Sequence, residues 1–108
     1  MKRKNANVNT RDCITEIKSK FNDIEKVCKE CNGVDYEVTV TSGKDGVHSK
    51  NSKHYSGGAI DIRSKDMKLP EYTTLRLKRK LGKDYDIVYE KDHIHIEYDP
   101  KPISINKP

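Results

Sequence analysis

The chain has 108 residues, of which 32% are hydrophobic and 36% are charged, and it contains no Trp. This length suits one domain, and the small apolar share predicts a small core. The net charge of +5 comes from 22 Lys and Arg residues against 17 Asp and Glu residues. Because the two signs are interleaved, they favour a solvated mixed-charge surface over a nucleic-acid-binding one.

The amino-terminal segment is basic and polar, and residues 1–9 are expected to form a disordered tail. No apolar segment follows it, which predicts a protein without a signal peptide that stays in the cytoplasm as synthesised. No apolar run is long enough to span a membrane. The oligomeric state is left open.

A helix is predicted over residues 11–31. Thr10 is suited to cap it, and apolar residues recur at steps of three and four from Ile14 to Cys28, which is typical of one buried helical face. Gly33 is suited to end it. Cys28 and Cys31 form a lone C-x-x-C at the end of this helix, and we interpret them as reduced residues of the helix face.

Strands are predicted at residues 36–41 and 59–63, where β-branched and apolar residues alternate with polar ones. The segment between them, residues 42–58, is polar and reads as a long loop. Loops of this length inside a compact domain are usually functional.

A second helix is predicted over residues 70–81, with Pro70 in its first turn and Gly82 as its stop. Residues 86–89 and 93–98 are expected to form a β-hairpin. Residues 101–108 are interpreted as a carboxy-terminal tail, which leaves a single domain at residues 10–100. The predicted fold is α+β, with a small, mostly antiparallel sheet, two helices on one side of it and a zinc site on the open face.

All four histidines lie in the long loop or in the last strand. His93 and His95 are two residues apart on a predicted strand, so both imidazoles point to one face. The two glycines that follow His54 allow the loop to turn back beside Asp61 on the neighbouring strand. His54, Asp61 and one of the paired histidines can therefore converge on one metal ion, and a fourth position is left for water.

A hydrolase of this kind also needs a base near the metal-bound water. Asp92, in the turn three residues before His95, is one candidate, and Glu97, on the same strand face as the two histidines, is its rival. His93, if it is not a ligand, can stabilise an oxyanion.

Two motifs in this order carry a resemblance to a known family. The string S-x-H-Y-x-G-x-A-x-D from Ser52 to Asp61, followed by D-H-x-H from Asp92 to His95, resembles the LAS-type zinc metallopeptidases of bacteria and phages. These are D-alanyl-D-alanine carboxypeptidases and L-alanyl-D-glutamate endopeptidases. The resemblance covers about residues 37–98.

The resemblance implies one zinc ion held by His54, Asp61 and His95, with Asp92 as general base and His93 stabilising the transition state. It implies hydrolysis of a peptide bond that involves a D-amino acid, with peptidoglycan or a muropeptide as substrate. So small a version is similar to those encoded by phages, which would act in the host cell or the virion.

The substrate-binding side is less well defined by the resemblance. Many members carry an Arg before the zinc histidine, and this chain has none between residues 42 and 53. Lys44 and His48 are candidates for its role, and Ser52 resembles a substrate-contacting position. Two alternatives stay open: a catalytically silent zinc-containing binding domain and a basic nucleic-acid binder.

Overall fold

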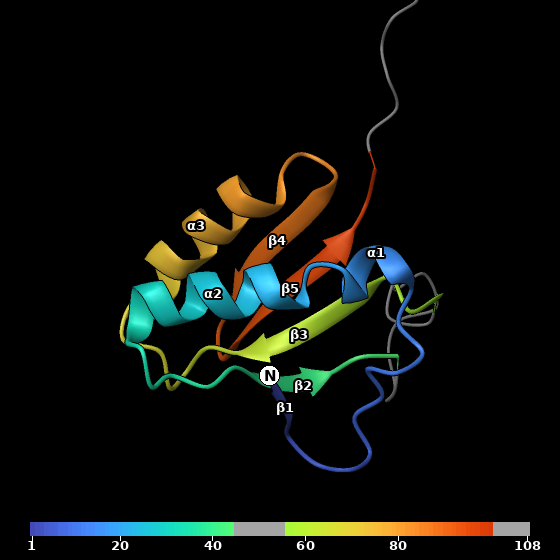
Figure 1. Ribbon diagram of the computed structural model, residues 1–108, viewed down its shortest axis with the longest axis horizontal. Helices are drawn as coiled ribbons and strands as arrows, with labels where there is room; N and C mark the ends of the chain where they lie inside the picture. The colour runs from blue at the N-terminus through green and yellow to red at the C-terminus, as the bar shows by residue number, and fades with distance from the viewer. Residues whose placement is uncertain (45–55, 101–108) are drawn as a thin grey trace, which may run out of the picture.

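A computed structural model describes residues 1–44 and 56–100. Five strands form one sheet in the order β1-β2-β3-β5-β4, and all neighbours are antiparallel except β1 and β2 (Figure 1). The strands are β1 (Lys2–Arg3), β2 (Thr39–Ser42), β3 (Ala59–Arg63), β4 (Tyr85–Glu90) and β5 (His93–Tyr98). The predicted α+β class with a mostly antiparallel sheet is confirmed.

The helices are α1 (Thr15–Lys18), α2 (Phe21–Asn32) and α3 (Pro70–Leu81). The two long helices, α2 and α3, lie side by side over one face of the sheet, as the sequence predicts (Figure 1). None of the described helices is both long and apolar enough to cross a bilayer.

The predicted helix over residues 11–31 is divided in two. The amide of Ile14 donates to the carbonyl oxygen of Gly57 at 3.0 Å, so the helix begins only at Thr15. Gly57 lies in a left-handed conformation, and a Cβ atom there would come within 2.6 Å of the carbonyl oxygen of Asp12. The residues just before α1 therefore contact the segment before β3 through the backbone, and the periodicity of the sequence cannot reveal this contact.

The first nine residues are ordered where the sequence predicts a disordered tail. Lys2 and Arg3 pair with Thr39 and Val40 as the short edge strand β1, and Val8 is buried. The pairing to β2 explains the difference, because it satisfies backbone groups that a free tail would leave to water. The predicted tail at residues 101–108 lies outside the described residues.

Alternation along β3 and β5 divides the sheet into an apolar face and a polar face. Ile60 faces Ile96 across the two strands, Ile62 faces Ile94, and all four side chains are fully buried under the helices. The helical stripe contributes Ile17 and Ile24 to the same core. The residues between the isoleucines are thus left on the other face, which none of the described helices covers.

Shortening an isoleucine of this core is expected to destabilise the fold. Ile96→Ala should lower the free energy of unfolding by about 2–5 kcal/mol, because it removes buried methyl groups and leaves a cavity. Val88→Ala is the matched control on the adjacent strand, since Val88 is 48% exposed. Urea unfolding measures both, and equal losses in the two variants would contradict this description of the core.

The three cysteines are free and buried. Burial raises the pKa of the Cys28 thiol to about 12, with the neighbouring Cys31 as the second cause. Cys28 is therefore a neutral core residue, in agreement with its place on the helical stripe.

The raised pKa of Cys28 makes stability depend on pH. Its folded pKa lies above its ordinary value of 9.0, so this stabilising contribution is complete below pH 9 and is lost as the pH rises toward 12. Between these values the unfolded chain ionises while the folded chain does not. Urea unfolding at pH 8 and pH 10.5 should show a steeper loss for the wild type than for Cys28→Ala, by up to about 1.4 kcal/mol per pH unit. An equal change of the unfolding free energy with pH in the two proteins would show that the pKa of Cys28 is not raised.

Candidate functional site

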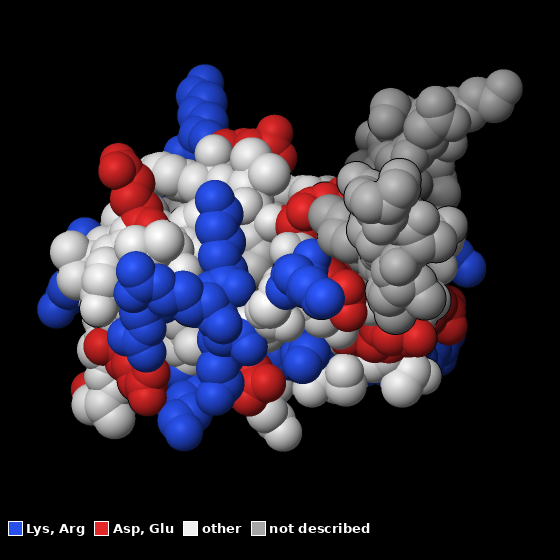
Figure 2. Space-filling view, turned by 90° about the horizontal axis from the view of Figure 1, so that it is seen from above, with Lys and Arg blue, Asp and Glu red and all other residues white. Residues whose placement is uncertain are grey.

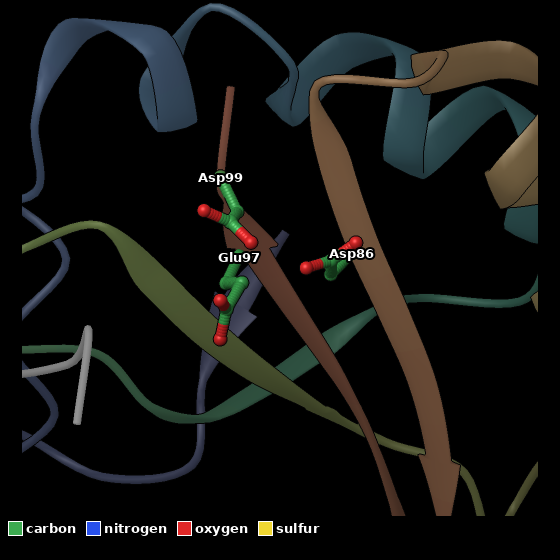
Figure 3. A group of neighbouring side chains, drawn as sticks. All are labelled: Asp86, Glu97 and Asp99. Atoms are coloured by element: carbon green, nitrogen blue, oxygen red, sulfur yellow. The ribbon is translucent and has the colours of Figure 1, made fainter. Parts of the chain in front are cut away.

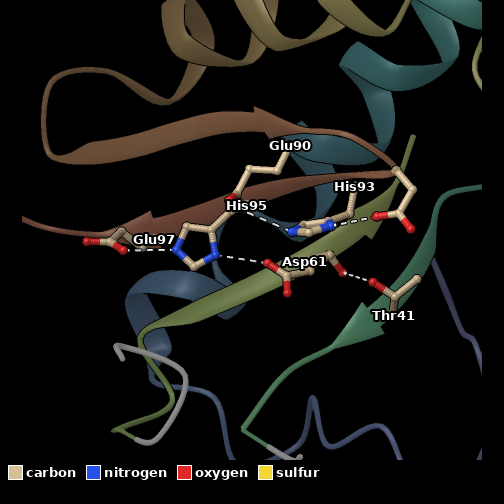
Figure 4. Close-up of polar contacts among 7 residues, drawn as sticks. Thr41, Asp61, Glu90, His93, His95 and Glu97 are labelled. Carbon is tan, nitrogen blue, oxygen red and sulfur yellow. Dashed lines mark hydrogen bonds and ion pairs between the residues drawn. The ribbon is translucent and has the colours of Figure 1, made fainter. Parts of the chain in front are cut away.

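The sheet face opposite the long helices, called the open face below, brings together most of the described residues that the sequence singles out. Asp61 lies opposite His95 across β3 and β5, and Arg63 lies opposite His93. Since the isoleucines between them point into the core, these polar side chains share the other face. Figure 4 shows Asp61, His93 and His95 there. The predicted orientation of both histidines is therefore correct.

Asp61, His95 and Glu97 form a continuous chain of polar contacts (Figure 4). Asp61 Oδ1 lies 2.9 Å from His95 Nδ1, and Glu97 Oε1 lies 2.9 Å from His95 Nε2. The side chains are 14%, 18% and 21% exposed. The two contacts hold the mostly buried imidazole ring in place from both sides.

The spacing of Asp61 and His95 fits two corners of a metal site. Ligand atoms around a tetrahedral zinc ion lie about 3.3 Å apart, close to the separation seen here. The contact from Glu97 to the other ring nitrogen is the one that commonly orients a metal-binding histidine. Glu97, the rival candidate for a base, lies on this face as the sequence predicts and is a hydrogen-bond partner of His95.

The same contacts set the charge of His95. The hydrogen bond with Asp61 is the largest cause that raises the pKa of His95, to about 9, against the opposing effect of burial and with further help from Glu97. In the absence of a metal, the ring is accordingly a cation that donates to two carboxylates. A metal ion bound at Nδ1 would take the place of that proton.

His93 and Asp92 form a second, more exposed group. His93 Nδ1 lies 2.9 Å from Asp92 Oδ1, and His93 Nε2 lies 3.4 Å from Glu90 Oε1. Burial lowers the pKa of His93, but Asp92 and the nearby acids outweigh it, so the pKa is raised overall. The hydrogen bond from His93 lowers the pKa of Asp92. Asp92 thus hydrogen-bonds to its chain neighbour, in the turn between β4 and β5.

The remaining predicted site residues are placed only in part. His54, His48 and Ser52 lie outside the described residues. Lys44 is exposed, and its backbone amide donates to the carbonyl oxygen of Asn9 at 2.9 Å. Its described contact is therefore with the amino-terminal loop.

An acidic group is joined to the Asp61–His95 pair through Glu97, which contacts His95. The side chains of Asp86, Glu97 and Asp99 are drawn in Figure 3. Their ligand oxygens lie within 4.8 Å of one another, and no other group of three acids, histidines or cysteines in the described ranges comes as close. Acidic side chains gather at exposed sheet edges without an ion, and one Glu97 oxygen is bonded to His95. The sequence signal for this group is the two-residue period of β4 and β5.

The basic run Arg76–Lys80 on α3 does not form a uniform cationic surface. Arg76 pairs with Glu30 of α2 at 2.8 Å, and Leu77 is buried in the core. Figure 2 shows Lys and Arg side chains beside Asp and Glu on the face seen there. This arrangement is typical of a solvated mixed-charge surface.

Comparison with known proteins identifies a different family from the one that the motifs resemble. The family model of the Hedgehog amino-terminal signalling domain matches residues 1–97. The chain is 38% identical to the Sonic hedgehog protein of Danio rerio over 80 residues, which are 72% of this chain and 19% of that protein. It is 39% identical to the Indian hedgehog protein of Gallus gallus over 70 residues, which are 64% of this chain and 17% of that protein. The chain spans less than a fifth of the length of these relatives.

This match corrects the expectations that rested on the peptidase resemblance. Hydrolysis of peptidoglycan, a zinc peptidase at residues 10–100, and a phage origin are all overturned by a signalling-domain match over the same residues. The two alternatives, a silent zinc-containing binding domain and a nucleic-acid binder, are likewise not supported.

The roles and setting that followed from hydrolysis change as well. The general base at Asp92 and the oxyanion group at His93 lose the reaction that they would serve. The peptidoglycan or muropeptide partner and the cytoplasmic location conflict with a signalling domain. The match covers both strands of the Asp61–His95 pair, and the chain belongs to the family of Hedgehog amino-terminal signalling domains.

Proposed function

We propose that this chain is a signalling domain that acts outside the cell by binding a receptor protein. The family match over residues 1–97 is the observation that carries this proposal. The similarity to Sonic and Indian hedgehog proteins supports it, since it extends over more than half of the chain.

The open face of the sheet is the surface that we assign to the receptor. The long helices cover the opposite face of the sheet (Figure 1), and none of the described helices lies over the polar side chains of β3, β4 and β5. Val88 lies on this face opposite His95 and is 48% exposed, which places an apolar side chain next to the Asp61–His95 pair. A small apolar contact surrounded by oriented polar groups is typical of a protein interface.

The proposal includes one zinc ion at this face, with Asp61 and His95 as two ligands and His54 as the third. The separation of 2.9 Å between Asp61 Oδ1 and His95 Nδ1, and the Glu97 contact behind the ring, support it. When bound, the ion would supply a cross-link between β3, β5 and the segment between β2 and β3, and such cross-links add to folding stability. We assign it a structural role beneath the receptor surface.

Receptor binding can be tested by competition. The purified chain, loaded with zinc, should displace labelled amino-terminal domain of Danio rerio Sonic hedgehog protein from Hedgehog-responsive cells in a saturable manner. Val88→Glu should weaken this competition by about 10-fold or more, because it places a charge in the proposed contact. Val34→Glu is the matched control, since Val34 is 81% exposed in the turn after α2. A folded chain that does not compete would refute the signalling proposal.

The metal site makes a separate prediction. Asp61→Asn should lose zinc on dialysis, as measured by elemental analysis, whereas the matched Asp92→Asn should retain one ion per chain. Glu97→Gln should weaken zinc binding by about 10–100-fold, because it removes the contact that orients His95. Retention of zinc by Asp61→Asn, or its equal loss from Asp92→Asn, would show that the ligands are misassigned.

A further inference from the structure

The sheet ends on one side in β4, an edge strand of six residues. Among the described strands, β4 pairs only with β5, whereas the opposite edge strand β1 has two residues. The register of β4 with β5 runs without a shift, and β4 contains no Pro. The strand therefore lacks the bulge and the Pro with which many proteins block a sheet edge.

Alternate residues of β4 direct their backbone groups away from β5. The amide of Asp99 donates to the carbonyl oxygen of Asp84 at 2.7 Å, so every second residue from Asp84 onward bonds to β5 in this antiparallel ladder. The N–H and C=O groups of Ile87 and Tyr89 accordingly point outward. No hydrogen bond within residues 1–44 and 56–100 reaches these outward groups. They are the donors and acceptors that an added strand needs.

A groove of about 580 Å³ runs along this edge. Residues 85–88 of β4 line it, together with Lys78 and Lys83 at the end of α3 and with His95 and Glu97 of β5. Because α3 covers one face of the sheet while His95 and Glu97 lie on the other, the groove reaches both faces past the edge of β4. An extended chain can therefore lie beside β4 without displacing a described element.

Side chains along the edge determine which strand fits it. Asp86, Val88 and Glu90 lie on the open face, since they pair with the residues of β5 on that face. Val88 is 48% exposed and the side chain of Glu90, labelled in Figure 4, is 53% exposed. Opposite residues of neighbouring strands share a face, so the two acids favour basic residues and Val88 favours an apolar one. A fitting strand carries a basic, an apolar and a basic residue at alternate positions.

The same acids disfavour a second copy of this chain at the edge. When the two-fold axis of an antiparallel β4–β4 pair lies at residue 86, Asp86 faces Asp86. When it lies at residue 87 or 88, Asp84 faces Glu90 or Asp86 faces Glu90, respectively. Like charges directly opposite each other destabilise a pair of strands. Charge therefore favours a different, basic partner over self-association.

We propose that the free edge of β4 binds an extended basic segment of a partner protein by strand addition. The segment lies antiparallel to β4, with Lys or Arg opposite Asp86 and Glu90 and an apolar residue opposite Val88. Backbone hydrogen bonds to Ile87 and Tyr89 supply the affinity, and the alternate side chains supply the specificity. The edge borders the open face, but strand addition there does not depend on the receptor proposal.

Titration of the full ¹⁵N-labelled chain with the capped peptide Thr-Arg-Thr-Val-Thr-Arg-Thr tests this edge. NMR should show saturable shifts along β4, and hydrogen exchange of the Ile87 and Tyr89 amides should slow by about 10-fold or more at saturation, because these amides gain a partner. The amide of Val88, which already bonds to β5, should change little. The same peptide with Glu in place of Arg should bind about 10-fold more weakly. Equal binding of the acidic peptide, or binding without slower exchange of the two amides, would overturn the proposal.

Backbone changes on either side of the contact separate strand addition from simple charge attraction. A peptide N-methylated at the two Thr residues next to Val should bind about 10-fold or more weakly, because it cannot donate to the carbonyl oxygens of Ile87 and Tyr89. Tyr89→Pro removes an outward N–H, which an edge strand tolerates, and should weaken binding in the same way. Unchanged binding in either case, with the variant folded, would overturn the proposal.

A charge reversal serves where Tyr89→Pro does not fold, as judged by its thermal unfolding. Glu90→Lys should shift the preference from the basic toward the acidic peptide. Glu71→Lys makes the same change at an exposed position of α3 and should keep the preference of the wild type. An unaltered preference in Glu90→Lys, or an equal change in both variants, would overturn the proposal.

Sedimentation of the chain without peptide tests the second copy as the occupant. The chain should stay monomeric over the concentrations used for the titration, because the acids of β4 oppose its pairing with itself. A concentration-dependent dimer that Tyr89→Pro abolishes would assign the edge to self-association and overturn the assignment to a basic segment.

Discussion

The pairing of β3 with β5 is the constraint on which the rest of this structure depends. Ile60 against Ile96 and Ile62 against Ile94 fill the space beneath α2 and α3. The same register places Asp61 beside His95 on the opposite face. A slip of one residue would turn the isoleucines to solvent and the ionisable groups into the core, so the hydrophobic pattern that builds the core also fixes the candidate site. The register of β3 with β5 therefore determines both the packing of the core and the geometry of the site.

Elements whose residues carry their own signals could be predicted from the sequence. The predicted bounds of the strand at 59–63 and of the helix at 70–81 agree with β3 and α3, because alternation, Pro70 and Gly82 are local. The predicted start of the helix at 11–31 is wrong, because the amide of Ile14 donates to the carbonyl oxygen of Gly57, more than forty positions away in the sequence. The strand at Lys2–Arg3 is similarly set by a distant partner, β2. Backbone pairing between distant segments is therefore the feature of this fold that local periodicity cannot predict.

The site shows a different division between what could and could not be predicted. A period of two is enough to put His93, His95 and Glu97 on one face, and the structure agrees. The predicted hydrolysis is wrong, because a spacing of histidines and a carboxylate describes where ligand atoms can meet and not whether a substrate is turned over. The family match uses residues 1–97, including the helices and the core positions that the two short motifs ignore. A whole-chain pattern could therefore separate a signalling domain from a peptidase where the motifs could not.

The open face is electrostatically divided, and this division has consequences for recognition. Around His95 the neighbouring groups are acidic, with Asp61, Glu97 and Asp86 close by, and a cation there would be well compensated. Beyond His93, at the end of the same strands, the basic residues Lys4, Arg63 and Lys65 outnumber the single acid Asp92. A partner that covers the whole face must present groups of both kinds in a fixed order along β5, because reversing its orientation would place like charges opposite each other. This division of charge constrains the orientation of a partner more strongly than its affinity, in line with the receptor binding that we propose.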